Sequence, residues 1–433
     1  MGWNRWYTTK SYLSSALWIV PLIAVALENV TIRFVFWLQG WLDWVPWLGA
    51  TPAGISDALS TIETMTISFI VFTFGAILIS IQVASGQLTP RIIATALLRN
   101  NVIRFTVGLF TFTMLFAVGT GIRIEPGTYH PAVTIVWVLG IASIATFLFL
   151  IDYTARLLRP ISIVWRIGEQ GINVIRSVYP DSVDIPRQPR PRQATKAPCR
   201  SVGHEGTSAI VLAVNQAALI SLAHKVDGLI EFMPRVGNFV STGEPLFRLY
   251  GNATRLGSHR LRAQVAFGPE RTIEQDSTFA FRVIVDIAIK ALSPAINDPT
   301  TAVLAIDQLH RLLRLVGRCH LHDDGRYDAD GVLRLIFPNP IWQDFVELAI
   351  SEIRLYGAGN FQVSRRLRAM IESLLESLPK NRRPALRREL DLLDRTLEKL
   401  HCFPEDLTLS RQADLQGLGG ASTPVDQPAI VQP

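Results

Sequence analysis

Charged residues are scarce in this sequence, at 18% of 433 residues, where soluble domains average about 25%. The scarcity is concentrated in the first part of the chain. Residues 1–155 hold 13 charged side chains, 7 basic and 6 acidic, against 65 in residues 156–433. This distribution excludes an ordinary soluble protein, and it excludes disorder over most of the chain. It predicts a membrane domain followed by a domain that is exposed to water.

Cysteines and recognisable metal or nucleotide motifs are also lacking. Cys199, Cys319 and Cys402 lie far apart and form no CxxC motif, which argues against a disulfide framework and a thiolate zinc site. His320 and His322 have no second motif that would complete a set of metal ligands. A Walker A motif is absent from the sequence, as is a GxGxxG motif that follows a strand. We therefore expect no metal and no cofactor.

The net charge and the lack of a recognisable catalytic triad exclude further classes of function or make them less favoured. The net charge of +6 comes from 42 basic and 36 acidic residues, and this mixture of signs does not predict nucleic-acid binding. Ser293 has no histidine close to it in the sequence that would activate it as a nucleophile. The sequence thus favours a role other than catalysis, without deciding the question.

Four runs without Asp, Glu, Lys or Arg predict membrane-spanning helices, for which about 20 apolar residues are needed. The first run can continue through Glu28 and Arg33 to about Leu38. Alternatively, Ser11–Ala26 is a cleaved signal segment that ends in small residues. The four runs are Ser11–Leu27, Thr64–Pro90, Phe105–Ile122 and Pro126–Ile151.

Basic residues in the short connecting segments predict the orientation of these spans. They alternate from one side to the other as expected for four spans whose two ends lie in the cytoplasm. The residues on the cytoplasmic side are Arg5, Lys10, Arg91, Arg99, Arg156, Arg159 and Arg166.

Polar positions inside the spans suggest either a path for an ion or contacts between helices. Glu28 and Arg33 are charges inside the first span. Either Arg33 contacts Glu63 at the start of the second span, or Arg33 extends to the outer interface and neighbouring hydroxyls hold Glu28. The second and third spans carry hydroxyl side chains at intervals of seven residues, which places each set on one helix face. These hydroxyl positions are Thr66, Thr73, Ser80, Thr106, Thr113 and Thr120.

The composition along the chain predicts an α-helical membrane domain with four transmembrane helices in residues 1–155, followed by a cytoplasmic α+β domain. A juxtamembrane helix and a Pro- and Arg-rich linker occupy residues 156–206. Residues 207–406 form the α+β domain, with a small β hairpin or barrel-like part and then helices. Residues 407–433 are predicted to be a disordered tail.

Acidic residues and arginines crowd into 28 residues around a Ser-Pro turn of this second domain. Because arginine binds phosphate through two parallel hydrogen bonds, the cluster could bind an anion or a nucleotide. Alternatively, it is a polar network that locks a helix corner, with one aspartate capping a helix that begins at Pro299. The members are Arg271, Glu274, Asp276, Arg282, Asp286, Ser293, Asn297 and Asp298.

The string Ala291-Leu-Ser-Pro-Ala-Ile-Asn-Asp-Pro299, together with the segment Gln82–Arg91, resembles one family of proteins. The family consists of bacterial predicted integral membrane proteins that are catalogued as a domain of unknown function. The resemblance extends over residues 12–403. It implies a multi-pass protein of the bacterial inner membrane with a cytoplasmic domain, and it implies no activity.

Two classes of function fit these features. The chain is either an oligomeric ion channel or transport protein that its cytoplasmic domain regulates, or a membrane-anchored sensor or scaffold whose cytoplasmic domain binds a ligand or a protein partner. Glu28 inside a span favours the first class. We expect the lipid bilayer, further copies of the chain and a small ion or ligand as partners, because four spans are few for a monomeric transporter.

Overall fold

Contacts between residues divide the protein into two compact units in the computed structural model. The helical unit consists of Tyr12–Gly86 and Pro90–Ile163, and the mixed unit consists of Met1–Ser11, Gln87–Thr89 and Val164–Pro433. The structure describes residues 2–38, 52–87, 101–124, 131–157, 159–181, 200–321 and 324–419.

Among the described residues, the helical unit contains four helices that are long and apolar enough to cross a membrane, which is the number expected from the sequence. The apolar run that begins at Ser11 is divided between two helices, α1 (Trp3–Ser15) and α2 (Ile19–Leu38), and α2 does extend past Glu28 to Leu38. The other three are α3 (Pro52–Gln87), α4 (Asn101–Arg123) and α5 (Pro131–Leu157).

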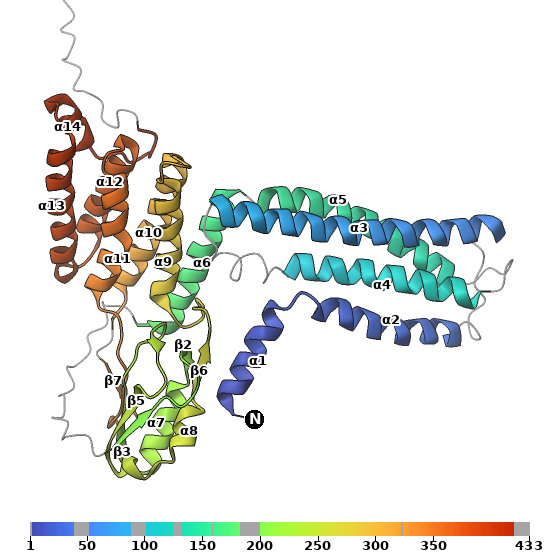
Figure 1. Ribbon diagram of the computed structural model, residues 1–433, viewed down its shortest axis with the longest axis horizontal. Helices are drawn as coiled ribbons and strands as arrows, with labels where there is room; N and C mark the ends of the chain where they lie inside the picture. Colours follow the sequence, from blue (N-terminus) through green and yellow to red (C-terminus); the bar gives the residue numbers. More distant parts are fainter. Residues whose placement is uncertain are drawn as a thin grey trace, which may run out of the picture. The chain divides into compact units, whose positions relative to one another are not determined.

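Aromatic and branched side chains hold α2 to α5 together. Phe69 of α3 stacks on Phe147 of α5 with 4.0 Å between ring centroids, and Phe110 of α4 completes this cluster. A second cluster joins Ile32 of α2 to Phe116 of α4. Helix α2 lies alongside α4 (Figure 1).

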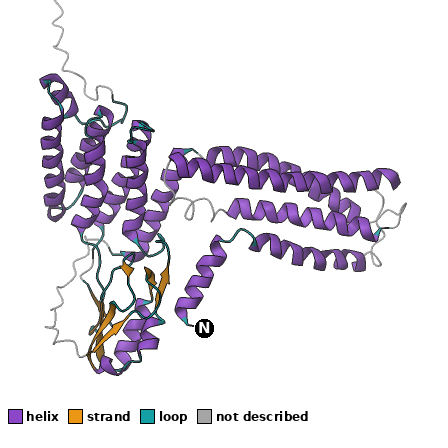
Figure 2. Ribbon diagram, viewed as in Figure 1, coloured by secondary structure: helices purple, strands orange, loops and turns teal. Residues whose placement is uncertain are grey.

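The mixed unit contains two small sheets rather than one hairpin or barrel (Figure 2). The five-stranded sheet has the order β1-β5-β3-β8-β7, in which only the β3–β8 pair is parallel. Its strands are β1 (Arg200–Gly203), β5 (Pro245–Gly251), β3 (Gly228–Phe232), β8 (Leu333–Ile336) and β7 (Gly325–Tyr327). The three-stranded sheet comprises β4 (Phe239–Val240), β2 (Ala209–Val214) and β6 (Val265–Gly268).

Helices make up the rest of the mixed unit. The amphipathic pattern correctly predicted the five helices that begin between residues 277 and 383, but not α14. Helix α7 interrupts a stretch that the sequence suggested was made of strands. The helices are α6 (Pro160–Val178), α7 (Gln216–Lys225), α8 (Ser258–Arg262), α9 (Ser277–Ala291), α10 (Pro299–Arg318), α11 (Trp342–Gly357), α12 (Phe361–Ser377), α13 (Arg383–Leu400) and α14 (Pro404–Ser410), with 3-10 turns at Asn252–Arg255 and Lys380–Arg382.

Residues 407–419 belong to the tail that the sequence predicted to be disordered, and they are folded against the mixed unit, so that prediction is wrong for them. The rest of the predicted tail lies outside the described residues. Arg365 is fully buried and donates hydrogen bonds to the carbonyl oxygens of Gln412 (3.0 Å) and Gly419 (2.9 Å). The carboxylate of Asp414 accepts the backbone N–H groups of three later residues. A buried arginine and a turn-forming aspartate thus hold a segment whose composition alone looks unstructured.

Candidate functional site

A cavity of about 980 Å³ lies within the mixed unit. Its wall combines segments that are far apart in the chain: the end of α6, the start of α7, the β3–β4 turn, the segment before α9, the β7–β8 region and α11. This wall contains proline and aromatic side chains as well as charged and amide side chains. A volume of this size is typical of pockets that enclose a small organic ligand.

Asp276 is the buried charged group of this cavity wall, at 5% exposure. It caps α9, because its Oδ1 accepts the backbone N–H groups of Thr278 (3.0 Å) and Phe279 (3.1 Å). Its Oδ2 has no hydrogen-bond partner among the residues that the structure describes. Burial raises the pKa of the Asp276 carboxyl, although the Thr278 hydrogen bond and the nearby charge of Arg271 act in the opposite direction.

The β3–β4 turn packs against this carboxylate through Gly237. Gly237 has a φ of +88°, and a Cβ atom there would lie 2.2 Å from the Oδ2 of Asp276. Only glycine fits such a contact, since it has no side chain and tolerates positive φ. The close contact between the β3–β4 turn and the N-terminus of α9 therefore requires glycine at position 237.

Most other charged groups of the wall are engaged with protein partners. Arg235 donates to the carboxylate of Asp344 at 2.9 Å. Arg326 donates to the side-chain oxygens of Gln216 and Asn339, at 3.2 Å in both cases. The wall thus has a fixed polar lining, with Asp276 as the buried group whose second oxygen lacks a donor.

The polar cluster predicted from the sequence is divided by the fold. Arg271, Glu274 and Asp276 line the cavity. Arg282 forms ion pairs with Asp286 on its own helix and with Glu352, which is itself part of the wall. The Arg282 hydrogen bond lowers the pKa of Glu352.

The remaining three cluster residues lie at the opposite end of α9. The Ser293 hydroxyl donates to the carbonyl of Lys290 at 2.7 Å, and Asn297 adopts a φ of +48° in the turn that follows. Asp298 caps α10 by accepting the N–H of Thr301 at 3.0 Å, with Pro299 at the first helical position. These residues form the helix corner that was the alternative interpretation of the cluster.

Sequence reasoning missed the wall residues that come from other parts of the chain. Tyr179 at the end of α6 is buried, and its hydroxyl lies 3.5 Å from that of Ser277. Burial raises the pKa of Tyr179. Tyr7 of α1 donates a short hydrogen bond to Glu274. No spacing in the sequence links these residues, which are brought together only by packing.

The hydroxyl stripes of the helical unit are buried among its helices. The hydroxyls of Thr66, Thr73 and Ser80 donate to the carbonyl four residues earlier on α3, at 2.6–2.8 Å. On α4, the hydroxyl of Thr113 accepts a hydrogen bond from the hydroxyl of Ser143 of α5 at 3.2 Å. The other two positions, Thr106 and Thr120, are buried as well.

Among the described residues, Arg33 and Glu63 do not form the pair that was one of the two arrangements expected for the charged residues of the spans. Arg33 is exposed, and no ion pair joins it to Glu63 among the residues that the structure describes. Glu63 is half-buried and faces Gly121 of α4. Glu28 is buried beside Arg123, which lies at the end of α4.

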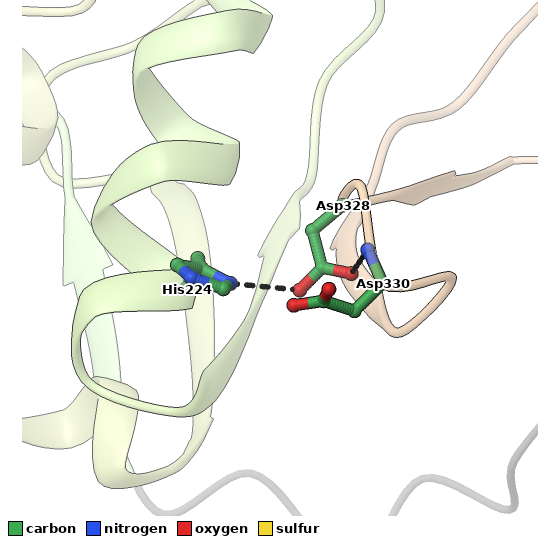
Figure 3. Close-up of side chains that lie close together, drawn as sticks. All are labelled: His224, Asp328 and Asp330. Atoms are coloured by element: carbon green, nitrogen blue, oxygen red, sulfur yellow. Dashed lines mark hydrogen bonds and ion pairs between the residues drawn. The ribbon is translucent and has the colours of Figure 1, made fainter.

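A separate group of possible metal ligands, His224, Asp328 and Asp330, lies on the mixed unit (Figure 3). The Oδ2 of Asp328 already accepts hydrogen bonds from His224 (2.9 Å) and from the guanidinium of Arg334 (2.7 Å). Its Oδ1 accepts the backbone N–H of Asp330 at 3.1 Å. An arginine thus supplies the positive charge at this carboxylate, and the contacts account for the cluster without a metal.

Comparison with known proteins gives a family for the chain. A family model for predicted membrane proteins, DUF2254, matches residues 14–373. An uncharacterised protein of Mycobacterium tuberculosis and one of Mycobacterium bovis are each 25% identical to the chain over 448 residues, which covers 99% of this chain and 84% of each relative. No solved structure gives a significant match. The chain therefore belongs to DUF2254, a family of predicted membrane proteins of unknown function.

Proposed function

We propose that this protein is a multi-pass membrane receptor whose mixed unit binds a small polar ligand in the 980 Å³ cavity. The observation that carries the proposal is the buried Asp276 in the wall of that cavity, with one carboxylate oxygen that lacks a donor. Buried polar atoms nearly always have a hydrogen-bond partner, and a buried carboxylate oxygen without a donor in the wall of a cavity is a candidate ligand-binding group. This is the sensor alternative of the sequence analysis.

The arrangement of the wall supports a role in signalling to the membrane part. Helix α6 follows α5, and its last two residues, Ser177 and Val178, line the cavity together with Tyr179 directly after it. The close approach of Gly171 to Ala280, where a Cβ atom would lie 2.9 Å away, packs α6 tightly against α9. Tyr7 of α1, which precedes α2, bonds the wall residue Glu274. Both segments that adjoin the apolar helices thus reach the proposed ligand site.

The hydroxyl stripes give less support to a channel. Thr66, Thr73 and Ser80 use their hydroxyls within their own helix, as Ser and Thr commonly do in membranes. A receptor of this design places the mixed unit in the cytoplasm and its four spans in the bacterial inner membrane, which is consistent with the distribution of basic residues. Assembly of several copies is part of the same proposal.

The test is a ligand screen on the full chain in detergent or nanodiscs, with the thermal unfolding temperature as the readout and a library of small polar metabolites as the probes. We expect a binding compound to raise this temperature in the wild-type protein. Asp276→Asn keeps the helix cap but removes the charge, so the rise should fall by at least half.

The matched control is Asp298→Asn, the same change at the N-cap of α10 away from the cavity wall. It should leave the ligand-induced rise unchanged. A screen without any stabilising compound, or an equal loss of the rise in both variants, would overturn the proposal.

A further inference from the structure

Glu28 of α2 is a carboxylate buried inside the helical unit, and it has no hydrogen bond or ion pair among the residues that the structure describes. Its exposure is 8%. The position is near the middle of a helix that is long and apolar enough to cross a membrane. Ionisable residues at such positions are rare and mostly functional.

The surroundings of Glu28 come mainly from the C-terminal part of α4. A Cβ atom at Gly119 would lie 3.0 Å from a carboxylate oxygen of Glu28 and 3.0 Å from a guanidinium nitrogen of Arg123. That nitrogen donates to the carbonyl of Gly119, also at 3.0 Å. The neighbouring hydroxyl of Thr120 is buried and has no hydrogen-bond partner within the described part of the chain. Arg123 is therefore close to Glu28 but bonded elsewhere.

Other charged groups are farther from this carboxylate or face away from it. Glu63 of α3 approaches Gly121 rather than Gly119. Arg33, on the same helix as Glu28, is exposed. From α5, the apolar side chains of Ala132, Val133 and Val136 pack in the same cluster as Ile32, one turn after Glu28.

Two opposing effects act on the charge of Glu28. Burial without hydrogen-bond donors penalises an ionised carboxylate, whereas a positive charge nearby, such as that of Arg123, favours it. A metal ion would require several oxygen ligands, and the groups described here supply one carboxylate. A proton requires only that carboxylate.

We propose that Glu28 is an exchangeable proton-binding site within the helical unit. The ionised carboxylate takes a proton from a hydronium ion, which leaves as water, and a neutral carboxylic acid forms with one new O–H bond. The reverse step returns the proton to water. This proposal does not depend on ligand binding in the mixed unit.

The test is infrared difference spectroscopy of the full chain in lipid vesicles, between an acidic and an alkaline buffer. Protonation of Glu28 should produce a carboxylic acid C=O band in the wild-type protein. Glu28→Gln should lose that band completely. The matched control is Glu63→Gln, which removes a neighbouring glutamate and should retain the band.

If Glu28→Gln does not fold, Arg123→Gln provides a second measurement. Removal of the nearby positive charge should move the band's pH midpoint to higher pH. Identical difference spectra in the wild-type protein and Glu28→Gln would overturn the proposal, as would an unchanged midpoint in Arg123→Gln. The first result would mean that Glu28 keeps one charge state throughout, and the second that the titrating carboxyl does not lie beside Arg123.

Discussion

Buried polar side chains find their partners differently in the two units. In the helical unit, the hydroxyls of Thr66 and Thr73 bond carbonyls one turn earlier on the same helix. In the mixed unit, Arg365 bonds backbone carbonyls 47 and 54 residues away, and Arg334 bonds Asp227, 107 residues away. The hydroxyls of Thr66 and Thr73 therefore carry little information about tertiary structure, whereas Arg365 and Arg334 each fix a long-range contact.

The largest expected effect tests the contact between the β3–β4 turn and α9. Gly237→Ala adds a Cβ atom 2.2 Å from the Asp276 carboxylate at a φ of +88°. We expect a loss of about 3 kcal/mol in the free energy of unfolding, from the left-handed backbone and the steric clash together. Urea unfolding followed by circular dichroism measures it.

Gly243→Ala is the matched control, because Gly243 has a φ of +87° and no atom within 4 Å of the added Cβ. It should cost about 1 kcal/mol, from the backbone conformation alone. Equal losses in the two variants would show that the turn can move away from Asp276 without cost.

A smaller effect is expected from Arg365→Leu, which removes the two long-range bonds to residues 412 and 419. The loss should be about 2 kcal/mol, since hydrogen bonds to charged groups are among the stronger ones. Hydrogen exchange should become faster in residues 411–419. Arg395→Leu breaks only an exposed pair with Asp391 and should cost less than about 0.5 kcal/mol. Unchanged hydrogen exchange of residues 411–419 in Arg365→Leu would contradict the view that Arg365 holds this segment in place.

The charge pairs of the mixed unit also predict how the free energy of unfolding depends on pH. Hydrogen bonds from Arg334 and His224 hold the pKa of Asp328 well below its usual range. A lowered carboxyl pKa stabilises the fold above the unfolded value of about 3.9, and this contribution is lost as the pH falls further. Asp328→Asn should therefore be less stable than the wild-type protein at pH 7, and the difference should shrink below about pH 4.

Unfolding at a series of pH values measures this difference. Asp330→Asn serves as the control, since Asp330 contributes its backbone N–H to Asp328 and keeps it in the variant. A gap between Asp328→Asn and the wild-type protein that stays constant from pH 7 to pH 3 would rule out the charge pair as its source.

The smallest effects are expected in the helical unit. Thr73→Val removes a hydroxyl that bonds its own helix and should change stability by less than about 0.5 kcal/mol. Thr113→Val removes the link to Ser143 of α5 and should cost roughly 0.6 kcal/mol, as bonds between membrane helices do on average. Unfolding in bicelles compares the two. A larger loss for Thr73→Val would contradict the view that its hydroxyl serves only its own helix.

Local patterns predicted much of the fold. The helix that begins at Ser277 was predicted from apolar periodicity, and the helix that begins at Pro299 from the same periodicity together with its capping residue Asp298. The cap that Asp276 forms is visible only in the structure. The candidate site was only partly accessible to such reasoning. Arg271, Glu274 and Asp276 lie close together in the sequence, and all three line the cavity. Tyr179, directly after α6, and Glu352 of α11 line it as well. No local rule links segments so far apart.

The sequence by itself determined the division into an apolar helical part and a charged mixed part, because composition and helical periodicity are local properties. It also determined the family, through a short specific string. Only the tertiary structure decided that Glu28 lies beside Arg123 rather than among hydroxyls, and that Asp276 faces Gly237. Such pairings depend on which surfaces pack together, and packing is a property of the whole chain rather than of any segment.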